Sequence, residues 1–514
     1  MSQDKPRNEG QPGLEGTFYI SISETFLHLE LSKFNFVFVL KLDQCSELSH
    51  DPLYLPSSFM LTRPIFSLTF FLAEMVIAAE QKPNFVFILA DDCSYLDLEL
   101  YGGPAKTPHL NKLAGEGMKF NRCYQSAPMC SPTRQALYTG LFPVKSGAYP
   151  NHARAYENVK SIPHYLKRVG YRVALAGKTH IDPKPVYPFE YIDEFAEPED
   201  EDVPMIDGWR YPEVRNLLRE SSEKKEPFCL FLCSNEPHGP YTKGDPAPYK
   251  DAKLSPQQFD FHRQSYASYL AEITYFDGQV GEVIRMLEKQ GLRENTLLIA
   301  ATEQGSGFPF GKWTCYEMGV ASGMVASWPG NIEAGSETDA IVEYTDIVPT
   351  FLDAAGAPIP EVLDGRSLLP LLRGETNRHS QYSYSLQTTR GVNGYKAPFG
   401  VRSVVGSEYR YIRNLFPENE FSIPVSRNLM KETALLDETE KARAARYLNR
   451  PPEELYHVIK DPYCQENLID KPALQETKNR LADALSNWMD EQGDTGRDVE
   501  LDAHGRQANW YKKN

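Results

Sequence analysis

Two pairs of side chains that could ligate a metal each follow a continuously apolar run. Asp91 and Asp92 come directly after NFVFILA, and Glu303 and Gln304 directly after TLLIAAT. Three carboxylates and one amide carbonyl form a hard oxygen donor set that suits Ca²⁺ or Mg²⁺, and flexible ligation by several oxygens favours Ca²⁺. An Asp pair after a strand is more commonly a helix cap or a solvated turn, so the pairs alone do not establish a metal site.

A reactive cysteine is the second candidate, in the run Cys130-Ser-Pro-Thr-Arg134. Pro132 is typical of a first helical turn, so we expect Cys130 to lie just before a helix N-terminus. That position lowers the pKa of a thiol and attracts anions, and Arg134 can point back to the same spot. An ordinary capped helix that begins near a cysteine remains the alternative, because the spacing alone does not decide.

The elements that would position these side chains alternate between strands and helices. The expected strands span 84–90, 172–177, 227–234, 296–301 and 323–328, and the expected helices span 107–117, 132–140, 161–170 and about 258–290, where Gly278 or Gly281 could break the last one. This alternation predicts an α/β fold, with a large, mostly parallel sheet sandwiched by helices. Such sheets bind ligands beyond the carboxyl ends of their strands, where both ligand pairs lie.

The pattern changes after about residue 373. Short antiparallel strands are expected at 382–386, 401–405 and 409–413, and helices at 431–447 and 472–491. We therefore predict a main α/β domain at 80–373, a smaller C-terminal α+β subdomain (antiparallel sheet plus helix) at 374–491, and a frayed polar tail at 492–514.

The N-terminal eighty residues do not share this pattern. Met60-Leu-Thr-Arg63 is a short positive start, an apolar stretch follows, and Val76-Ile-Ala78 supplies small residues before Glu80. These features are typical of a secretory signal peptide. We predict a signal peptide at 60–79, a non-native or disordered extension at 1–59, and a periplasmic or secreted protein. Glu74 interrupts the apolar stretch, so no stable membrane span is expected; a buried helix or an N-terminal anchor is the alternative.

Charge and cysteine usage exclude several classes of protein. The net charge of -16 argues against a nucleic-acid partner, which would require a basic patch. The cysteines contain no CxxC pair, so a zinc ribbon or a thioredoxin-like motif is not expected. They are Cys45, Cys93, Cys123, Cys130, Cys229, Cys233, Cys315 and Cys464.

The motifs together resemble a known family. A C-x-P-x-R run that follows a strand ending in Asp-Asp resembles the type I, formylglycine-dependent sulfatases of the alkaline phosphatase superfamily. The resemblance runs from about residue 82 to 468 and includes, in order, KPNFVFILADD, CSPTR, LYTG, GKTH, PHGP, TEQG, GKWTCYE and ELYHVIKDP.

The resemblance implies a role for each candidate residue. A maturation enzyme would oxidise Cys130 to formylglycine, whose hydrated gem-diol attacks sulfur, and Arg134 would orient that diol. The implied metal ligands are Asp91, Asp92, Cys130, Glu303 and Gln304, with Ca²⁺ expected rather than Mg²⁺. Lys178, His238 and Lys312 would bind the sulfate of a sulfated carbohydrate or a small sulfate ester.

Proton transfer is left open among the remaining basic residues. His180 or His238 could protonate the leaving alcohol or deprotonate the diol, and the family pattern puts His180 nearer the diol and His238 nearer the leaving group. Lys312 could instead donate to the leaving oxygen.

Three positions depart from the family pattern. Glu303-Gln304 stands where Asp is usually followed by Asn or His, so each side chain is one methylene longer. Thr179 replaces the usual Trp between Lys178 and His180, and Cys93-Ser94 replaces Leu-Gly after the Asp pair.

Three functions are therefore compared. The first is a sulfatase that cleaves an O-sulfate or an N-sulfate from a carbohydrate or a small organic sulfate. The second is a phosphonate or phosphodiester hydrolase of the same superfamily. The third is a non-catalytic, metal-stabilised carbohydrate-binding protein, which requires that Cys130 is never matured.

Overall fold

The computed structural model describes residues 82–192, 212–390, 392 and 394–508, together with three short strands nearer the N-terminus. The chain divides into two compact units, Met1–Ala79 and Glu80–Asn514. In the first unit β1 (Tyr19–Ser23), β2 (Phe26–Glu30) and β3 (Val37–Lys41) pair as an antiparallel sheet. The rest of the expected extension 1–59 and the expected signal peptide at 60–79 lie outside the described residues. Among the helices that are described, none has both the length and the apolar character needed to cross a bilayer.

A nine-stranded, mostly parallel sheet forms the centre of the second unit. Its strands are β4 (Asn84–Ala90), β5 (Met118–Tyr124), β6 (Arg172–Gly177), β7 (Glu190–Ile192), β8 (Phe228–Cys233), β9 (Thr296–Thr302), β10 (Ala321–Ser327), β11 (Ser336–Thr338) and β12 (Val342–Glu343). The order is β11-β5-β10-β9-β4-β8-β6-β7, and β12 also pairs with β5. Only the pairs that involve β10 are antiparallel among these described strands. The predicted α/β fold is confirmed.

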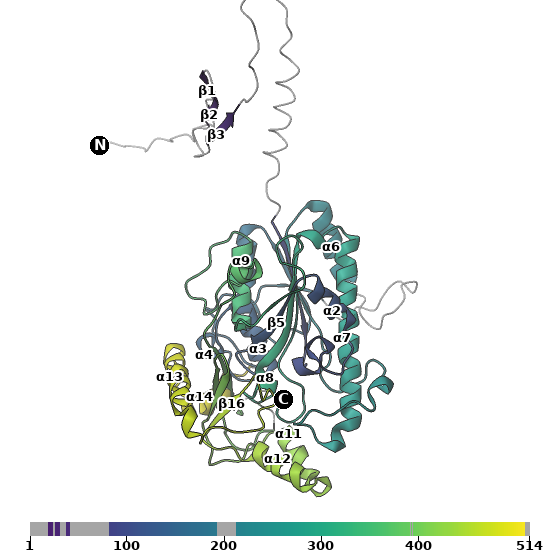
Figure 1. Cartoon of the computed structure of the whole chain (residues 1–514), viewed down its shortest axis with the longest axis vertical. Coiled ribbons are helices and arrows are strands. Elements are labelled where there is room, and N and C mark those ends of the chain that lie inside the picture. Colours follow the sequence, from purple (N-terminus) through teal and green to yellow (C-terminus); the bar gives the residue numbers. More distant parts are fainter. Residues whose placement is uncertain are drawn as a thin grey trace, which may run out of the picture. The chain divides into compact units, whose positions relative to one another are not determined.

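Helices cover both faces of this sheet (Figure 1). They are α2 (Pro108–Gly115), α3 (Cys130–Thr139), α4 (Pro143–Ser146), α5 (Ile162–Leu166), α6 (Pro212–Lys224), α7 (Arg263–Lys289), α8 (Glu317–Val320), α9 (Ile347–Ala354) and α10 (Leu369–Leu372). On β4, Phe85, Phe87 and Leu89 pack in one core with residues of α3 and α9. The alternate residues Val86 and Ile88 pack with α2, α6 and α7 on the other face. Strand β4 is therefore buried on both sides, which explains its continuously apolar sequence.

Helix α7 runs unbroken through Gly278 and Gly281, so the possible break at either glycine does not occur. A Cβ at Gly281 would lie 2.6 Å from the ring of His109, which lies on α2. Gly281 therefore allows the two helices to pack closely, and it does not interrupt α7.

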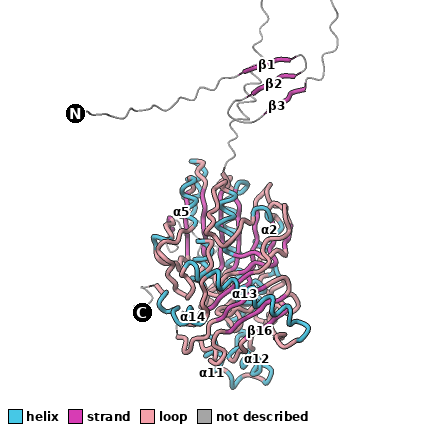
Figure 2. Tube along the Cα trace, turned by 90° about the vertical axis from the view of Figure 1, so that its left-hand side faces the viewer, coloured by secondary structure: helices cyan, strands magenta, loops and turns pink. Residues whose placement is uncertain are grey.

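A second, four-stranded antiparallel sheet forms the C-terminal subdomain, as predicted. Its strands are β13 (Ser383–Gln387), β14 (Val401–Val405), β15 (Tyr409–Asn414) and β16 (Glu453–His457), and its helices are α11 (Pro424–Lys431), α12 (Glu438–Leu448) and α13 (Gln475–Gln492). Figure 2 shows α13 lying across this sheet. Helix α12 begins later than expected, where the Asp437 side chain accepts a hydrogen bond from the backbone N–H of Glu440.

The prediction of a frayed polar tail is wrong for the described part of that segment. Residues Arg497–Asp502 form α14, and a 3₁₀ turn, Ala503–Arg506, follows. Glu500 is fully buried and accepts hydrogen bonds from the backbone N–H groups of Thr389, at 3.1 Å, and Arg390, at 3.0 Å. A polar side chain of this segment therefore accepts hydrogen bonds from backbone N–H groups of the C-terminal subdomain. The polar composition does not indicate a solvated chain end.

Candidate functional site

The carboxyl ends of β4 and β9 bring the two predicted ligand pairs side by side. The strands are parallel neighbours, with Ala90 opposite Thr302. Beyond this register the backbone N–H of Glu303 donates to the carbonyl of Ala90, and that of Cys93 donates to the carbonyl of Glu303, both at 3.1 Å. Asp92 and Gln304 both adopt positive φ, 58° and 21°. Non-glycine residues rarely do so, and such strain gathers at functional sites.

Cys130 lies among these side chains. Its Sγ is 3.0 Å from Nε2 of Gln304, 3.4 Å from Oδ1 of Asp91 and 3.9 Å from Oδ1 of Asp92. Helix α3 begins at Cys130 itself, two residues earlier than expected. The predicted lowering of the thiol pKa is wrong: burial and the neighbouring Asp91 carboxylate raise the pKa of Cys130 to about 12. Unmodified Cys130 is therefore a protonated thiol near neutral pH.

Arg134 lies one turn further along α3 and is fully buried. Its Nη2 is 2.6 Å from Oε2 of Glu303 and 3.7 Å from Oδ1 of Asp91, and its Nη1 donates to the carbonyl of Lys178 at 2.8 Å. The guanidinium thus links the helix start, both strand ends and the loop after β6.

Two lysines complete the cationic side of the site. Lys178, which follows β6, bonds through Nζ to Oδ2 of Asp91 and lies 3.9 Å from Sγ of Cys130. Lys312 Nζ donates to Oδ2 of Asp92 at 2.8 Å. Burial alone would raise the pKa of Asp91, but Lys178, with further cations behind it, holds that pKa well below its usual value. The predicted lysines and carboxylates therefore neutralise one another within the site.

The two predicted histidines differ in their surroundings. His238 is partly exposed, and its Nε2 lies 3.5 Å from Oδ2 of Asp92. His180 makes its hydrogen bond through Nε2 to Nδ1 of His152, at 2.6 Å. His152 was not among the residues predicted from the sequence, because the surrounding Pro-Asn-His-Ala run contains no motif that marks a site.

The donor atoms fit a hard divalent cation. Oε1 of Glu303 and Oε1 of Gln304 are buried oxygens without a hydrogen-bond partner among the described residues. The Gln304 amide directs Nε2 to Asp92, at 2.5 Å, and a half-turn of that amide would direct its oxygen there instead. Asp91, Cys130 and His238 also offer ligand atoms that lie within 4.8 Å of one another. His238 was not among the predicted ligands.

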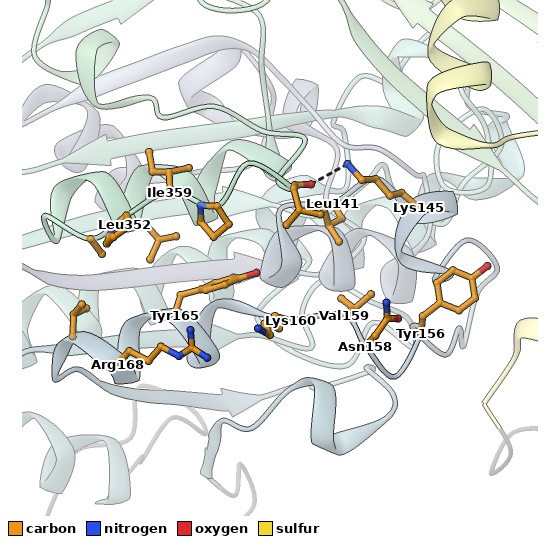
Figure 3. A pocket seen from close by; sticks show the side chains of 15 residues that line it. Leu141, Lys145, Tyr156, Asn158, Val159, Lys160, Tyr165, Arg168, Leu352 and Ile359 are labelled. Atoms are coloured by element: carbon orange, nitrogen blue, oxygen red, sulfur yellow. Dashed lines mark hydrogen bonds between the residues drawn. The ribbon is translucent and has the colours of Figure 1, made fainter. Parts of the chain in front are cut away.

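A separate cavity of about 720 Å³ lies near the other end of α3 (Figure 3). Apolar side chains such as Leu141, Leu352 and Ile359 line it, together with Lys160 and Arg168. None of the predicted site residues lines this cavity. Its volume is within the range of ligand pockets, but the candidate chemical groups converge at the strand ends and not here.

Comparisons with known proteins show which family the chain belongs to. The chain matches the family model described as "Sulfatase" over residues 83–357 and the one described as "N-sulphoglucosamine sulphohydrolase, C-terminal" over residues 305–423. An ulvan-active sulfatase of Formosa agariphila is 33% identical over 426 residues, which cover 81% of this chain and 82% of that protein. The N-sulphoglucosamine sulphohydrolase of Homo sapiens is 26% identical over 458 residues, covering 79% of this chain and 89% of that protein.

A solved structure shows the same fold at lower identity. The phosphonate monoester hydrolase of Agrobacterium radiobacter superposes with a TM-score of 0.62 at 17% identity, covering 80% of this chain and 96% of that chain. The family model and the ulvan-active relative decide the assignment: the chain belongs to the sulfatase family of the alkaline phosphatase superfamily and is a sulfuric ester hydrolase.

Proposed function

We propose that this sulfatase removes sulfate from a sulfated carbohydrate, with a formylglycine made from Cys130 as nucleophile and Ca²⁺ as cofactor. The observation that supports the proposal best is the position of Cys130. Its Sγ lies within 3.0–3.9 Å of side-chain atoms from both strand ends and of Nζ of Lys178. The names of the two sulfatase relatives, one acting on ulvan and one on N-sulphoglucosamine, support a carbohydrate substrate.

The cofactor and the modified cysteine would each supply one function that the chain lacks. Asp91, Asp92, Glu303 and Gln304 would hold the ion, which would supply Lewis-acid polarisation of sulfate oxygens. Oxidation of Cys130 to a hydrated aldehyde would supply one hydroxyl to attack sulfur and another to release sulfate. An adduct of sulfate on the unmodified Cys130 thiol would have no second hydroxyl on the same carbon, and so no comparable route to release sulfate.

The side chains of the protein bind and orient the sulfate. Lys178 is bonded to the carboxylate of Asp91 and Lys312 to that of Asp92, and both lysines can donate to sulfate oxygens as charge develops there. Arg134 is fixed by Glu303 and holds the start of α3 against the strand ends. His238 is the most exposed of these groups, which suits proton donation to the leaving oxygen of an entering substrate.

We also propose that the protein is exported, as the Met60–Ala79 pattern indicates. N-terminal sequencing of secreted material should find a start near Ala79 or Glu80. Secreted protein that still carries residues 1–59 would contradict this proposal.

Mass spectrometry of the peptide that contains Cys130 tests the nucleophile. Conversion to formylglycine makes that peptide lighter than unmodified cysteine, whereas sulfenic, sulfinic and sulfonic oxidation make it heavier. Matured protein should show the lighter species. A fully unmodified peptide in active protein would contradict the proposed nucleophile.

A substrate panel tests the reaction. Released sulfate is measured with O-sulfated and N-sulfated mono- and oligosaccharides, in parallel with an aryl sulfate and an aryl phosphonate ester. The proposal predicts the highest kcat/KM on a sulfated saccharide. A higher kcat/KM on the phosphonate ester would favour the second function. No turnover of any substrate, together with a Cys130 that stays unmodified, would favour the third.

A further inference from the structure

His152 and His180 contact each other directly through their rings. Nε2 of His180 lies 2.6 Å from Nδ1 of His152, and the ring centroids are 4.6 Å apart. Both residues have a left-handed backbone, with φ of 57° for His152 and 49° for His180. Two strained residues that meet ring to ring beside Lys178 require a surrounding structure that holds both of them in place.

The helix that carries Cys130 holds the loop of His152 on one side. The backbone N–H of Ala153 donates to Oγ of Ser131 at 3.1 Å, and Nε2 of Gln135 donates to the carbonyl of Ala153 at 3.1 Å. Ser131 directly follows Cys130 in α3, so the position of His152 is tied to that of the nucleophile.

The C-terminal segment holds the same loop on the other side. The backbone N–H of Ala508 donates to the carbonyl of His152 at 2.8 Å, and that of Arg154 donates to the carbonyl of Arg506 at 2.8 Å. Ala153 and Gln507 form an antiparallel bridge between these two bonds. His152 is thus fixed by contacts on both sides of its loop, although the loop has no regular secondary structure of its own.

The pKa values of His152 and His180 indicate that one N–H hydrogen lies between the two rings. Burial, with Lys312 and Lys178 adding to it, lowers the pKa of His152 to about 4. Burial and the neighbouring Lys178 also lower the pKa of His180 well below its usual value. Both rings are therefore neutral near pH 7, and a single hydrogen lies between them. If Nε2 of His180 carries that hydrogen, Nδ1 of His180 is an acceptor; if Nδ1 of His152 carries it, Nδ1 of His180 is a donor.

We propose that His152 is a positioning residue for the sulfatase reaction, and that it sets the ring orientation and tautomer of His180 through this imidazole–imidazole hydrogen bond. The inference rests on the proposed sulfatase function and on the sequence-based expectation that His180 takes part in proton transfer. His152 itself need not touch the substrate, because its effect passes through His180.

A double-mutant cycle tests this proposal. His152→Asn removes the ring contact, while Asn tolerates the left-handed backbone better than most non-glycine residues. We expect this variant to lower kcat by about 10- to 100-fold with little change in KM, because a misplaced proton-transfer group costs that much. In protein that already carries His180→Ala, His152→Asn should cost less than about twofold, because its partner is gone.

Three controls keep the result interpretable. The Cys130 conversion of every variant is measured by mass spectrometry, so that a maturation defect is not counted as lost kcat. His164→Ala removes another partly buried histidine, whose ring bonds within its own helix start, and should keep wild-type kcat. His152→Gln can hydrogen-bond again and should recover part of the loss. His152→Gly, which has no side chain and accepts the left-handed backbone, replaces His152→Asn in the cycle if that variant does not fold.

Two outcomes would overturn the inference. One is wild-type kcat in His152→Asn. The other is a loss of the same size with and without His180, which would mean that His152 acts independently. Wild-type sulfate release is measured separately, so either outcome would count against His152 alone and leave the proposed function standing.

Discussion

At the scale of single residues, the site balances buried charges closely. Three carboxyl groups, from Asp91, Asp92 and Glu303, meet three cations, from Arg134, Lys178 and Lys312. Burial raises the pKa of Glu303, and the Arg134 guanidinium opposes that rise. Charges of this kind are tolerated in a protein interior only when they are paired, because each one loses its hydration on burial. Arg134 and Glu303 are both fully buried, so each depends on the other more than a surface pair would.

Glu303→Gln should therefore destabilise the protein even without metal. The substitution keeps the shape of the side chain but leaves the Arg134 guanidinium without its nearest carboxylate, which costs about 3 kcal/mol in a buried pair. Urea unfolding of chelator-treated protein measures this directly. Added Ca²⁺ should also raise the melting temperature less in the variant than in the wild type, because one proposed ligand has lost its charge.

Glu223→Gln is the matched control for this experiment. Glu223 pairs with Arg219 at 3.2 Å, but both side chains are about half exposed. An exposed pair contributes less than about 1 kcal/mol. An equal loss of stability in the two variants would show that the Arg134–Glu303 pair has no special structural role.

At the scale of elements, the sequence predicted the convergence of the site but not all of its parts. The apolar runs of β4 and β9 end in polar pairs, so their meeting at one sheet edge followed from the rules of parallel sheets. Strand β5 (MKFNRCY) was not predicted, because polar residues interrupt its apolar pattern. The antiparallel direction of β10 depends on tertiary pairing with β5 and β9, which no local signal encodes.

His152 was missed for a related reason. Its place beside His180 depends on hydrogen bonds from α3 and from residues 506–508, which lie far away in the chain. No sequence pattern around His152 predicts either of these contacts. The start of α3 at Cys130 was likewise misplaced by two residues, because Pro132 is compatible with more than one position in the first turn.

The packing of the end of β6 determines the position of Lys178, which directly follows this strand. Gly177 has φ of 80°, and a Cβ there would lie 2.2 Å from the carbonyl oxygen of Cys233 in the adjacent strand. Gly177→Ala should therefore push apart β6 and β8 just before Lys178. We expect a loss of about 1–3 kcal/mol in the free energy of unfolding and a fall of about 10-fold in kcat/KM for sulfate release.

Gly170→Ala is the control that separates the cost of a strained backbone conformation from the displacement of neighbouring strands. Gly170 has a similar φ of 87°, but no atom lies within 4 Å of an added Cβ. This control should lose about 1 kcal/mol from the backbone conformation and keep wild-type kcat/KM. If Gly177→Ala also kept wild-type kcat/KM, the loop of Lys178 would not depend on the packing of this strand end.

At the scale of the whole described unit, the C-terminal segment joins regions that are distant in the chain. Glu500 satisfies backbone groups of Thr389 and Arg390 after β13, and residues 506–508 pair with the loop of His152. Arg402 and Asp494 form a further fully buried pair between β14 and the start of this segment. The prediction of a frayed tail failed because polar composition does not distinguish a solvated residue from one that satisfies buried backbone groups.

Glu500→Ala should measure the contribution of this segment. The change leaves two buried backbone N–H groups without their acceptor, which costs about 2 kcal/mol in the free energy of unfolding. Asp498→Ala, at an exposed position of the same helix, should cost less than about 1 kcal/mol. Equal unfolding midpoints of the Glu500→Ala variant and the wild type in urea would mean that α14 is not needed to hold the subdomain.

The central claim is that Cys130, after oxidation, attacks sulfate at the junction of β4, β9 and α3. The most direct test compares sulfate release from a sulfated saccharide by matured wild-type protein and by Cys130→Ala at equal concentrations. We expect the variant to keep its fold and its binding of Ca²⁺ but to fall below about 1% of wild-type kcat, because loss of a covalent nucleophile costs several orders of magnitude. A folded Cys130→Ala protein that retained more than this would contradict the assigned nucleophile.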